Sequence, residues 1–561
     1  MDITVLSTND TLPLNTRGSI TYSSGGVLNS LGNFVDDFTG AVPGTISKGF
    51  GNPNLNSGAT MFAPYIEDAW RIKNNLTLNM GLRYEYWGAL ANGLAFPAFN
   101  TNAGVGLPNA TAAYADPAHP ALFDSLFSFE QVPDKRNFAP RLGLAYAPHW
   151  GRFLFGDGKT VLRAGYGIFY DGLFTNITDN SAESQPNSFG GNISSPTGRG
   201  TANASTFPGI SPKLAPTLFI QSMASNLHNP LTQQWNVDVQ RELPLGLVLT
   251  LAYVGTRGEH LFANQDFNPQ VFNVPTNPNF GEIGILTNAA DSWYDSGQAE
   301  VERRIHTLVL RAAYTYSKFL DDASEINLTT GTSTYAQILT NQRSDWGPSA
   351  FDQRHRFTVA YVWQAPYFHR NAYLRALTDE WEWSGIAAIE SGTPNTVVVG
   401  FDNIGNGHPN ARPNLGNVMA PLNSLGIDGG DFNEPGFVSG KYYDFHCWVN
   451  RIFFGSATTC PVEPAGTFHF VVPNRLPGNV GRNSLFGPGQ IYFDTAIQRD
   501  FPIHFWKLEN QTLEFRAELF NAFNHPNLFT PSYNMFDPNF NNTAITINGG
   551  RQIRFWLKYS F

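Results

Sequence analysis

Apolar and polar side chains alternate along many short segments of this chain. Between Leu76 and Tyr86, six apolar side chains alternate with five polar or small ones. A period of two places successive side chains on opposite faces of a β-strand, and these eleven residues match the length of a tilted membrane strand. The same alternation recurs in four further segments: 235–240, 308–317, 356–363 and 513–520. The pattern predicts an all-β protein whose strands have one apolar and one polar face.

The connections between these segments alternate between short and long. The short ones are 73–75, 156–158 and 243–246, and the long ones are 88–137, 171–232, 257–296, 318–354, 391–490 and 521–549. Short periplasmic turns and long extracellular loops are typical of an antiparallel transmembrane outer-membrane β-barrel. A soluble β-sandwich also alternates, but it rarely carries so many long loops. We therefore predict a barrel with about fifteen strands in this chain, surrounded by outer-membrane lipid.

Composition favours the barrel over several soluble domains. Charged residues make up 14% of the chain, against about 25% in ordinary soluble proteins. Aromatic residues also reach 14%, which suits strands that have one lipid face and one wet face. There is no apolar run of membrane-helix length. The net charge of −10, without a basic cluster, argues against a nucleic-acid partner.

The first residues, MDITVLSTND, lack the basic and apolar regions of a secretory signal. An outer-membrane protein has to be exported, and single-chain bacterial barrels have even strand numbers. We therefore expect residues 1–561 to form one barrel domain that is incomplete at its N-terminus.

The last strand ends in an aromatic residue. Counting back from the end, every second residue is apolar: Phe561, Tyr559, Leu557, Phe555 and Ile553. A terminal Phe on an alternating strand looks like the signal that the barrel-assembly machinery reads. The alternative is an ordinary edge strand, but an apolar edge on a soluble protein would invite aggregation.

Several short motifs occur together and in order. They are APYIEDAWR (63–71), LTLNMGLRYE (76–85), FAPRLGLAY (138–146), LRAGYGIFYD (162–171), QWN (234–236), YVG (253–255), YTYSK (314–318), FDQRHRF (351–357) and FRAELFN (515–521). From roughly residue 15 to its end, the chain resembles the Oar-like TonB-dependent outer-membrane receptors of the carboxypeptidase-regulatory-like-domain-containing type.

The resemblance implies a larger, twenty-two-stranded barrel with an internal plug, energised through the TonB complex. The plug, the TonB box and the regulatory-like module are not recognisable in this sequence. We therefore expect the TonB complex to act only through parts outside these residues.

Two cysteines, Cys447 and Cys460, lie in the longest predicted loop. A disulfide between them would stabilise the loop by about 3 kcal/mol in the entropic model. Two free thiols, or a metal pair with His446, are the alternatives. The metal pair is disfavoured because His446 is the one nearby histidine.

Other candidate motifs point away from catalysis. The GKT at 158–160 lacks the upstream glycine of a phosphate-binding loop. Asp352, Arg354 and His355 form a charged cluster at a strand entrance, without a nucleophile that the spacing indicates. Such a cluster more simply orders a strand end. We predict no catalytic, cofactor-binding or metal-binding residues and no enzyme.

Charged residues on the polar strand faces are candidates for the barrel lumen. They are Arg83, Glu85, Arg311, Glu514, Arg516 and Glu518. They could contact a plug or a solute, or they could form a hydrated wall in which charges pair with one another. Because neighbouring strands supply both signs of charge, we favour the wall.

The sequence therefore predicts the barrel of a TonB-dependent receptor or transporter, which takes up an unidentified solute from an extracellular ligand site. The alternative is a structural or adhesive outer-membrane barrel without active transport. A passive porin is disfavoured, because the large predicted loops would cover the mouth of the pore.

Overall fold

A computed structural model describes most of the chain. The described residues are 2–11, 19–22, 44–51, 54–94, 96–101, 127–128, 130–151, 155–156, 158–184, 187–195, 218–278, 280–305, 307–326, 334–365, 381–429, 436–456, 459–503, 511–543 and 545–560. Within them, no helix is both long enough and apolar enough to cross a membrane.

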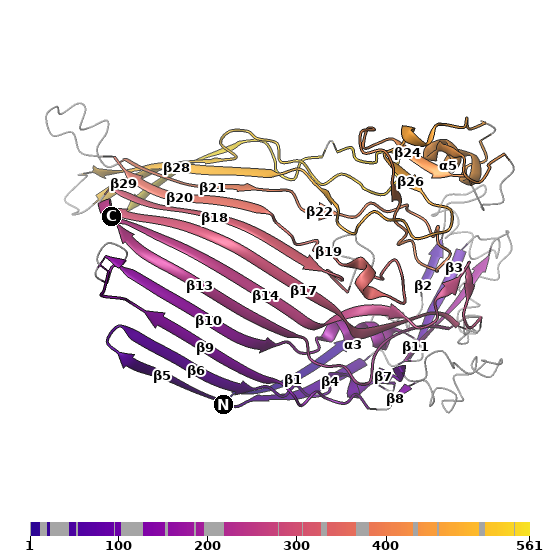
Figure 1. The fold of residues 1–561 in the computed structure, drawn as a ribbon, viewed down its shortest axis with the longest axis horizontal. Helices are drawn as coiled ribbons and strands as arrows, with labels where there is room; N and C mark the ends of the chain where they lie inside the picture. The colour runs from indigo at the N-terminus through magenta and orange to yellow at the C-terminus, as the bar shows by residue number, and fades with distance from the viewer. Residues whose placement is uncertain are drawn as a thin grey trace.

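One large sheet dominates the structure, and its strands lie side by side in Figure 1. It contains fifteen strands, of which thirteen form a continuous antiparallel path. In chain order these are β5 (Tyr65–Lys73), β6 (Leu76–Tyr84), β9 (Phe138–Tyr146), β10 (Thr160–Tyr170), β13 (Leu231–Leu243), β14 (Leu247–Asp266), β17 (Phe280–Ile305), β18 (Leu308–Asp321), β20 (His355–Gln364), β21 (Trp381–Glu390), β28 (Gln490–Ile503), β29 (Gln511–Phe520) and β30 (Gln552–Ser560). The continuous path is therefore shorter than the roughly fifteen barrel strands that the sequence predicts.

Two strands lie off this path. β12 (Leu218–Met223) pairs in parallel with the start of β17, and β19 (Gly347–Pro348) pairs with the end of β18. β1 (Asp2–Thr11) pairs with β4 (Asn54–Ala63), which leads directly into β5.

The register of the strands separates the apolar and polar residues into two faces. Between β29 and β30, Phe515 lies opposite Leu557, whereas Glu514 lies opposite Lys558. Directly opposed residues of an antiparallel pair share a face. Followed from strand to strand, this register places Leu78, on β6, on the same face as Leu557. The alternation read from the sequence therefore continues across the whole sheet.

Strands β5 and β30 are the two edges of this path. Every residue of each strand is exposed, and among the described residues β5 pairs only with β6 and β30 only with β29. The sheet is curved but is not closed by these strands. Edges with unpaired backbone groups are unfavourable in lipid, so a membrane form has to cover or pair both.

The two ends of the sheet differ. Short turns join β5 to β6 and β13 to β14 at the left of Figure 1, where the C-terminus lies, and long connections gather at the right. The turn between β13 and β14 is η6 (Pro244–Gly246), in which Leu245 has a positive φ of 68°.

The prediction of a long loop over 257–296 is wrong. β14 continues to Asp266 and β17 begins at Phe280, so the connection is reduced to 267–279 and contains the small hairpin of β15 (Gln270–Val271) and β16 (Val274–Pro275). The pairing shifts register at Gly258, Leu261 and Ala263, where His260 has a φ of 57°. A β-bulge of this kind interrupts the period of two, so the alternation does not reveal the outer halves of these strands.

Small elements and one apolar core fill the lower right of Figure 1. They are η1 (Leu90–Gly93), β7 (Ala98–Phe99), β8 (Phe127–Ser128), α3 (Thr175–Glu183), and the sheet of β2 (Ser19–Tyr22), β3 (Gly44–Gly51) and β11 (Ser188–Ser195). The buried core contains Phe99, Ile177, Ile220 and Phe280, so it joins α3 and β12 to the start of β17.

A second apolar core forms a loop module at the upper right of Figure 1, which we define as the described residues 393–429, 436–456, 459–489 and 532–541. Its elements are β22 (Pro394–Asn395), β23 (Asn414–Leu415), β24 (Leu425–Asp428), β25 (Tyr442–Asp444), α5 (Phe445–Phe453), η8 (Ala465–Thr467), β26 (Phe470–Val472) and β27 (Leu485–Phe486). Trp448, Phe445 and Tyr443 are almost fully buried in it. The long loop predicted here is thus a folded unit. A further short helix, η7 (Gln342–Asp345), lies between it and β18.

Candidate ligand site at the long-connection end of the sheet

Five of the six charged residues singled out on polar strand faces share one face by register, and the sixth, Glu85, follows the end of β6. Oppositely charged neighbours pair there: Arg311 Nη2 lies 2.9 Å from Glu300 Oε2, and Lys558 Nζ lies 3.8 Å from Glu514 Oε2. Two further pairs, Arg83 with Glu85 and Arg516 with Glu518, are each separated by 2.8 Å. These contacts describe a charge-paired wall. Exposed pairs of this kind add little stability.

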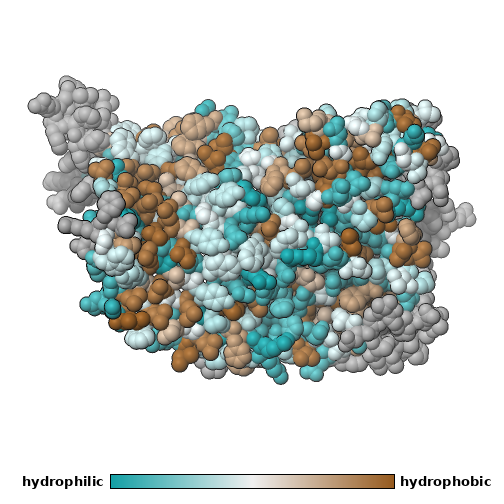
Figure 2. Space-filling model, viewed as in Figure 1, coloured by the Kyte–Doolittle hydropathy of each residue, from teal (hydrophilic) through white to brown (hydrophobic). Residues whose placement is uncertain are grey.

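The strand of the suggested assembly signal is fully exposed. Phe555 and Leu557 are 71% and 70% exposed, and they share a face with Ile553 and Tyr559. The opposite face carries Trp556, whose Nε1–H donates to Glu518 Oε2 at 2.9 Å. The terminal Phe561 lies outside the described residues. On the face seen in Figure 2, hydrophobic residues gather near the short-turn end of the strands.

Cys447 and Cys460 form a disulfide in the loop module. Cys447 lies in the first turn of α5, where its backbone N–H donates to the side chain of Asp444 at 2.8 Å. Asp444 caps the helix, which is a favoured position for aspartate. The disulfide and the buried Trp448 therefore hold α5 on the same apolar core.

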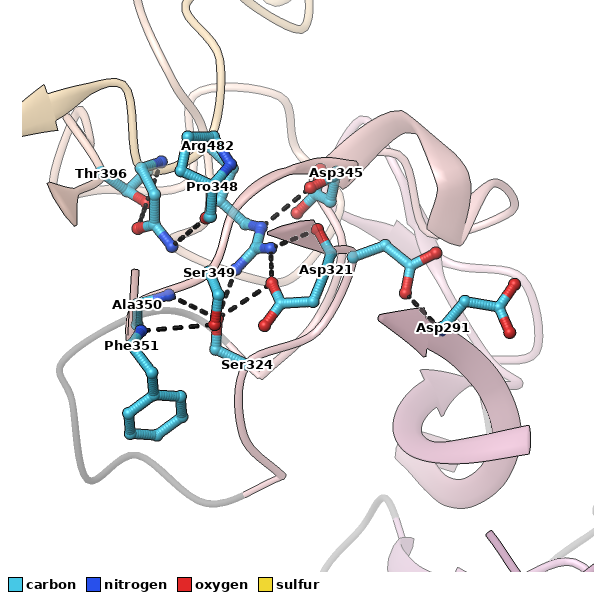
Figure 3. A network of polar contacts seen from close by, with 12 residues as sticks. Asp291, Asp321, Ser324, Asp345, Pro348, Ser349, Ala350, Phe351, Thr396 and Arg482 are labelled. Carbon is cyan, nitrogen blue, oxygen red and sulfur yellow. Dashed lines mark hydrogen bonds and ion pairs between the residues drawn. The ribbon is translucent and has the colours of Figure 1, made fainter. Parts of the chain in front are cut away.

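A buried ion network joins the loop module to the sheet (Figure 3). Arg482 pairs with the carboxylate of Asp321 at the end of β18, and its Nε–H donates to the backbone oxygen of Asp345 at 2.8 Å. Its Nη1–H also donates to Ser324 Oγ at 2.8 Å. Arg412, from the loop module, pairs with Asp345 Oδ1 at 2.8 Å. These bonds fix the module at the end of β18.

The charged cluster at 352–355 has a local structural role. Asp352 is fully buried, and it accepts from the backbone N–H of Phe319 at 2.7 Å and from Arg354 Nη2 at 2.9 Å. His355 contacts the hydroxyl of Tyr314. These contacts tie the start of β20 to the end of β18. Within the described part of the chain, no group of three or more His, Cys, Asp or Glu side chains is placed to hold a metal ion.

A cavity of about 300 Å³ lies between α3, β12 and the start of β17. Its lining includes Ser181 of α3, Ser222 of β12 and Glu282 of β17. Ile177 and Leu286 contribute apolar surface and belong to the buried core beneath. This volume is at the lower end of the range for small-molecule sites. The cavity is therefore the candidate ligand site.

One side of the cavity is fixed by a chain of polar contacts. The hydroxyl of Tyr335 donates to Glu282 Oε1, and the ring of Tyr335 packs on His408 with centroids 4.1 Å apart. His408 Nε2 lies 3.0 Å from Asp266 Oδ2. Burial, together with the charge of Glu282, raises the pKa of the Tyr335 phenol. Tyr335 is therefore a neutral hydrogen-bond donor at physiological pH.

Gly284 makes this arrangement possible. A Cβ atom at this position would lie 2.4 Å from the hydroxyl oxygen of Tyr335, so a larger residue would force the Tyr335 side chain to shift. The glycine therefore leaves the space in which Tyr335 reaches Glu282.

Sequence reasoning missed all the polar residues of this cavity. Ser181, Ser222, Glu282 and Tyr335 come from four separate segments, and each stands in a stretch without a recognised motif. The sequence predicts a loop over 257–296, the segment that contains Glu282. Its β-branched and aliphatic run GEIGIL (281–286) was the one available signal for a strand there.

Comparison with known proteins gives one family and several solved structures. The family described as outer membrane beta barrel domain matches residues 1–554. No curated protein sequence matches the chain.

Three similar solved structures cover most of this chain. The outer membrane transporter YddB from Escherichia coli is 11% identical, with a TM-score of 0.48, over 99% of this chain and 49% of YddB. The siderophore receptor PirA from Acinetobacter baumannii is 9% identical, with a TM-score of 0.42, over 92% of this chain and 51% of PirA. The ferripyoverdine receptor of Pseudomonas aeruginosa is 10% identical, with a TM-score of 0.39, over 92% of this chain and 44% of the receptor. The chain thus spans about half the length of these proteins.

Proposed function

Because this chain belongs to the outer membrane beta barrel domain family, we propose that it forms the barrel wall and outer loops of a TonB-dependent receptor that takes up a solute. The family places the protein in the bacterial outer membrane. The short turns then lie in the periplasm, and the long connections lie outside the cell.

The observation that carries this proposal is the separation of the two sheet faces. One face of the thirteen strands is mostly apolar, which suits contact with lipid, although it also carries Asp68, Arg303 and Arg499. The other face carries paired charges of both signs. A hydrated, charge-paired face suits the lumen of a large barrel. The barrel-assembly machinery and lipid are the partners that such a wall requires.

The extracellular end supports a receptor over an open pore. The loop module is anchored by buried ion pairs, and the cavity at α3 and β12 lies on the other apolar core, which contains Ile177 and Phe280. Folded extracellular segments suit ligand capture. The requirement for TonB comes from the motif resemblance and is part of the proposal.

The test compares source cells with and without the gene. We expect the wild-type cells to deplete one class of solute from the medium, and uptake to stop when the proton-motive force is collapsed by an uncoupler. Uptake that is identical in both strains would contradict the proposal.

The alternative function is adhesion by a structural outer-membrane barrel. The folded loop module, with Phe454 and Met419 exposed at 70% and 87%, is the observation that favours it. Loss of surface attachment in the deletion strain, with unchanged uptake, would support adhesion. The intact mass of the protein purified from the outer membrane also helps to distinguish transport from adhesion, because energised transport needs a plug and a TonB box.

A further inference from the structure

The loop module carries a cleft of its own, which shares no lining residue with the cavity at α3. The cleft encloses about 200 Å³ between the β15–β16 hairpin, the end of α5 and the turn at 402–405. The hairpin is held there because the backbone N–H of Asn273 donates to the backbone oxygen of Gly405 at 2.9 Å. A Cβ atom on Gly405 would lie 2.9 Å from the Cα atom of Phe272, so the glycine allows this close approach. The walls of the cleft are therefore joined by backbone contacts, as in a preformed ligand site.

Aromatic rings line the module side of this cleft. Phe401 stacks on Trp448 at an interplanar angle of 22° with ring centroids 5.6 Å apart, and Phe453 lies 5.8 Å from both rings. Trp448 is 1% exposed and forms the floor, whereas Phe401 is half-buried and Phe453 is 50% exposed. Phe401 and Phe453 can therefore contact a ligand. A further ring would extend this cluster and would remove apolar surface from water.

Arg475 supplies the one positive charge among the described lining residues. It is half-buried, and within the described chain it forms no ion pair and no hydrogen bond. Asp402 supplies the one carboxylate of that lining, and its oxygens already accept from three backbone N–H groups, those of residues 405–407. A guanidinium group is a strong donor to a carboxylate, which it can bind through two parallel hydrogen bonds. The charge of the cleft therefore favours an anionic group on the ligand.

The backbone of Arg475 is a second, independent observation. Its φ of 46° lies in the left-handed region, which glycine and asparagine adopt more readily than a residue with a long side chain. Residues held in such conformations gather at ligand-binding sites, where the surrounding structure enforces them. No bond within the described protein accounts for an arginine at this position, whereas an external anion would.

The size of the cleft limits the ligand to about one ring. A cavity of about 150 Å³ is enough to enclose benzene, and the 200 Å³ of this cleft leave room for a ring and one small acidic group. An aliphatic acid would reach Arg475, but it would not stack on Phe401. An aromatic amine would stack, but it would meet Arg475 as a like charge.

We propose that this cleft binds a small aromatic carboxylate, with the ring against Phe401 and Phe453 and the carboxylate on Arg475. The extracellular placement of the cleft rests on the proposed function, which the inference deepens by naming the chemical class of the solute. Binding itself can be measured without transport.

The experiment measures binding at pH 7 by equilibrium dialysis against the full chain, purified in detergent. Three probes of similar size are compared: phenylacetate, cyclohexylacetate, which lacks the aromatic ring, and phenethylamine, which reverses the charge. The variants are Arg475→Asn and Phe453→Leu. The control for the first is Lys441→Asn, which removes an exposed positive charge elsewhere on the loop module. The control for the second is Phe454→Leu, which changes a 70% exposed ring outside the lining.

We expect phenylacetate to bind with a Kd below about 1 mM. Cyclohexylacetate should bind about three- to tenfold more weakly, and phenethylamine at least about tenfold more weakly. Arg475→Asn should raise the Kd for phenylacetate about tenfold, and Phe453→Leu about three- to tenfold. Both control variants should leave this Kd unchanged.

The variant Arg475→Asn separates a binding role from a structural one. Asparagine tolerates a φ of 46° better than arginine does, and the substitution removes no internal bond. The unfolding temperature should therefore stay equal or rise while binding weakens. An unchanged Kd in Arg475→Asn, equal binding of cyclohexylacetate, preferred binding of phenethylamine, or no binding of phenylacetate at about 10 mM would each overturn the inference.

Failure of this inference and failure of the proposed function are distinguishable. Phenylacetate binding without uptake in cells would overturn transport and leave the cleft assignment intact. Energised uptake of another solute, without phenylacetate binding, would overturn the cleft assignment alone.

Discussion

Arg482 shows how one residue holds two distant parts of the chain together. Its guanidinium group is buried. It bonds to Asp321, at the end of β18, and to the backbone oxygen of Asp345, whereas Arg482 itself belongs to the loop module. The sequence shows no sign of this role, because Arg482 stands in an irregular segment and its partners are more than a hundred residues away. Buried partners that lie so far apart along the chain produce no local pattern in the sequence.

We expect Arg482→Met to loosen the attachment of the loop module. Removing one partner of a buried ion pair costs about 3–5 kcal/mol, because the other charge stays buried. Native-state proteolysis of the full chain should therefore cleave the module at least about a hundredfold faster. Arg311→Met is the matched control, since Arg311 is 65% exposed and its partner Glu300 is 30% exposed, so no buried charge is left unpaired. Equal rates for the two variants would contradict the anchoring role.

Asp134 links loop stability to pH at the extracellular end. Burial raises the pKa of its carboxyl, but the backbone N–H of Arg136 and the side chain of His228 outweigh that effect, so the pKa is lowered below 3.8. A lowered pKa means that the ionised form is favoured in the folded state. Its stabilising effect is therefore present above the ordinary aspartate pKa, and it is lost as the pH falls through the lower folded value.

We expect hydrogen exchange in 130–137, corrected for the intrinsic rate, to accelerate as the pH falls below about 4. Asp134→Asn should remove most of that dependence and should raise the exchange already at pH 6. An acid-induced change of the same size in Asp134→Asn would show that another group is responsible.

At the scale of elements, the loop module is the largest departure from what the alternation predicts. Its strands are two to four residues long and its helix α5 is short, so neither the strand period nor the helix period extends far enough in the sequence to be recognised. Apolar residues such as Val397, Ile427 and Trp448 converge only in three dimensions. By contrast, β6, β18 and β29 alternate without interruption over a membrane-strand length, and the sequence predicts them correctly.

We expect replacement of both Cys447 and Cys460 by serine to destabilise the loop module by about 3 kcal/mol, because a short closed loop gains freedom in the unfolded state. Cleavage within 436–472 by a protease should become faster, while the heat-dependent gel mobility that reports the barrel should not change. Single Cys→Ser variants should match the double variant. Unchanged cleavage in the double variant would show that the apolar core alone holds α5.

At the scale of the whole molecule, the central claim is that the sheet has one lipid face and one wet face. The register carries this alternation through thirteen strands, because each face of one strand continues onto the same face of its neighbours. What the sequence could not predict is the pair of exposed edges at β5 and β30, because pairing between strands is a property of the sheet. In a lipid bilayer, the backbone groups of both edges have to be covered or paired.

Two neighbouring alanines on β18 test this claim most directly. Ala312 lies opposite Val301 and Val359, and Ala313 lies opposite Glu300 and Thr358. We would measure the unfolding free energy of the full chain in phospholipid vesicles for Ala312→Arg and Ala313→Arg. The account expects Ala312→Arg to lose about 2–4 kcal/mol, as arginine does on a lipid face near the midplane, and Ala313→Arg to stay close to the wild type. Equal losses, or a greater loss for Ala313→Arg, would contradict the assignment of the two faces.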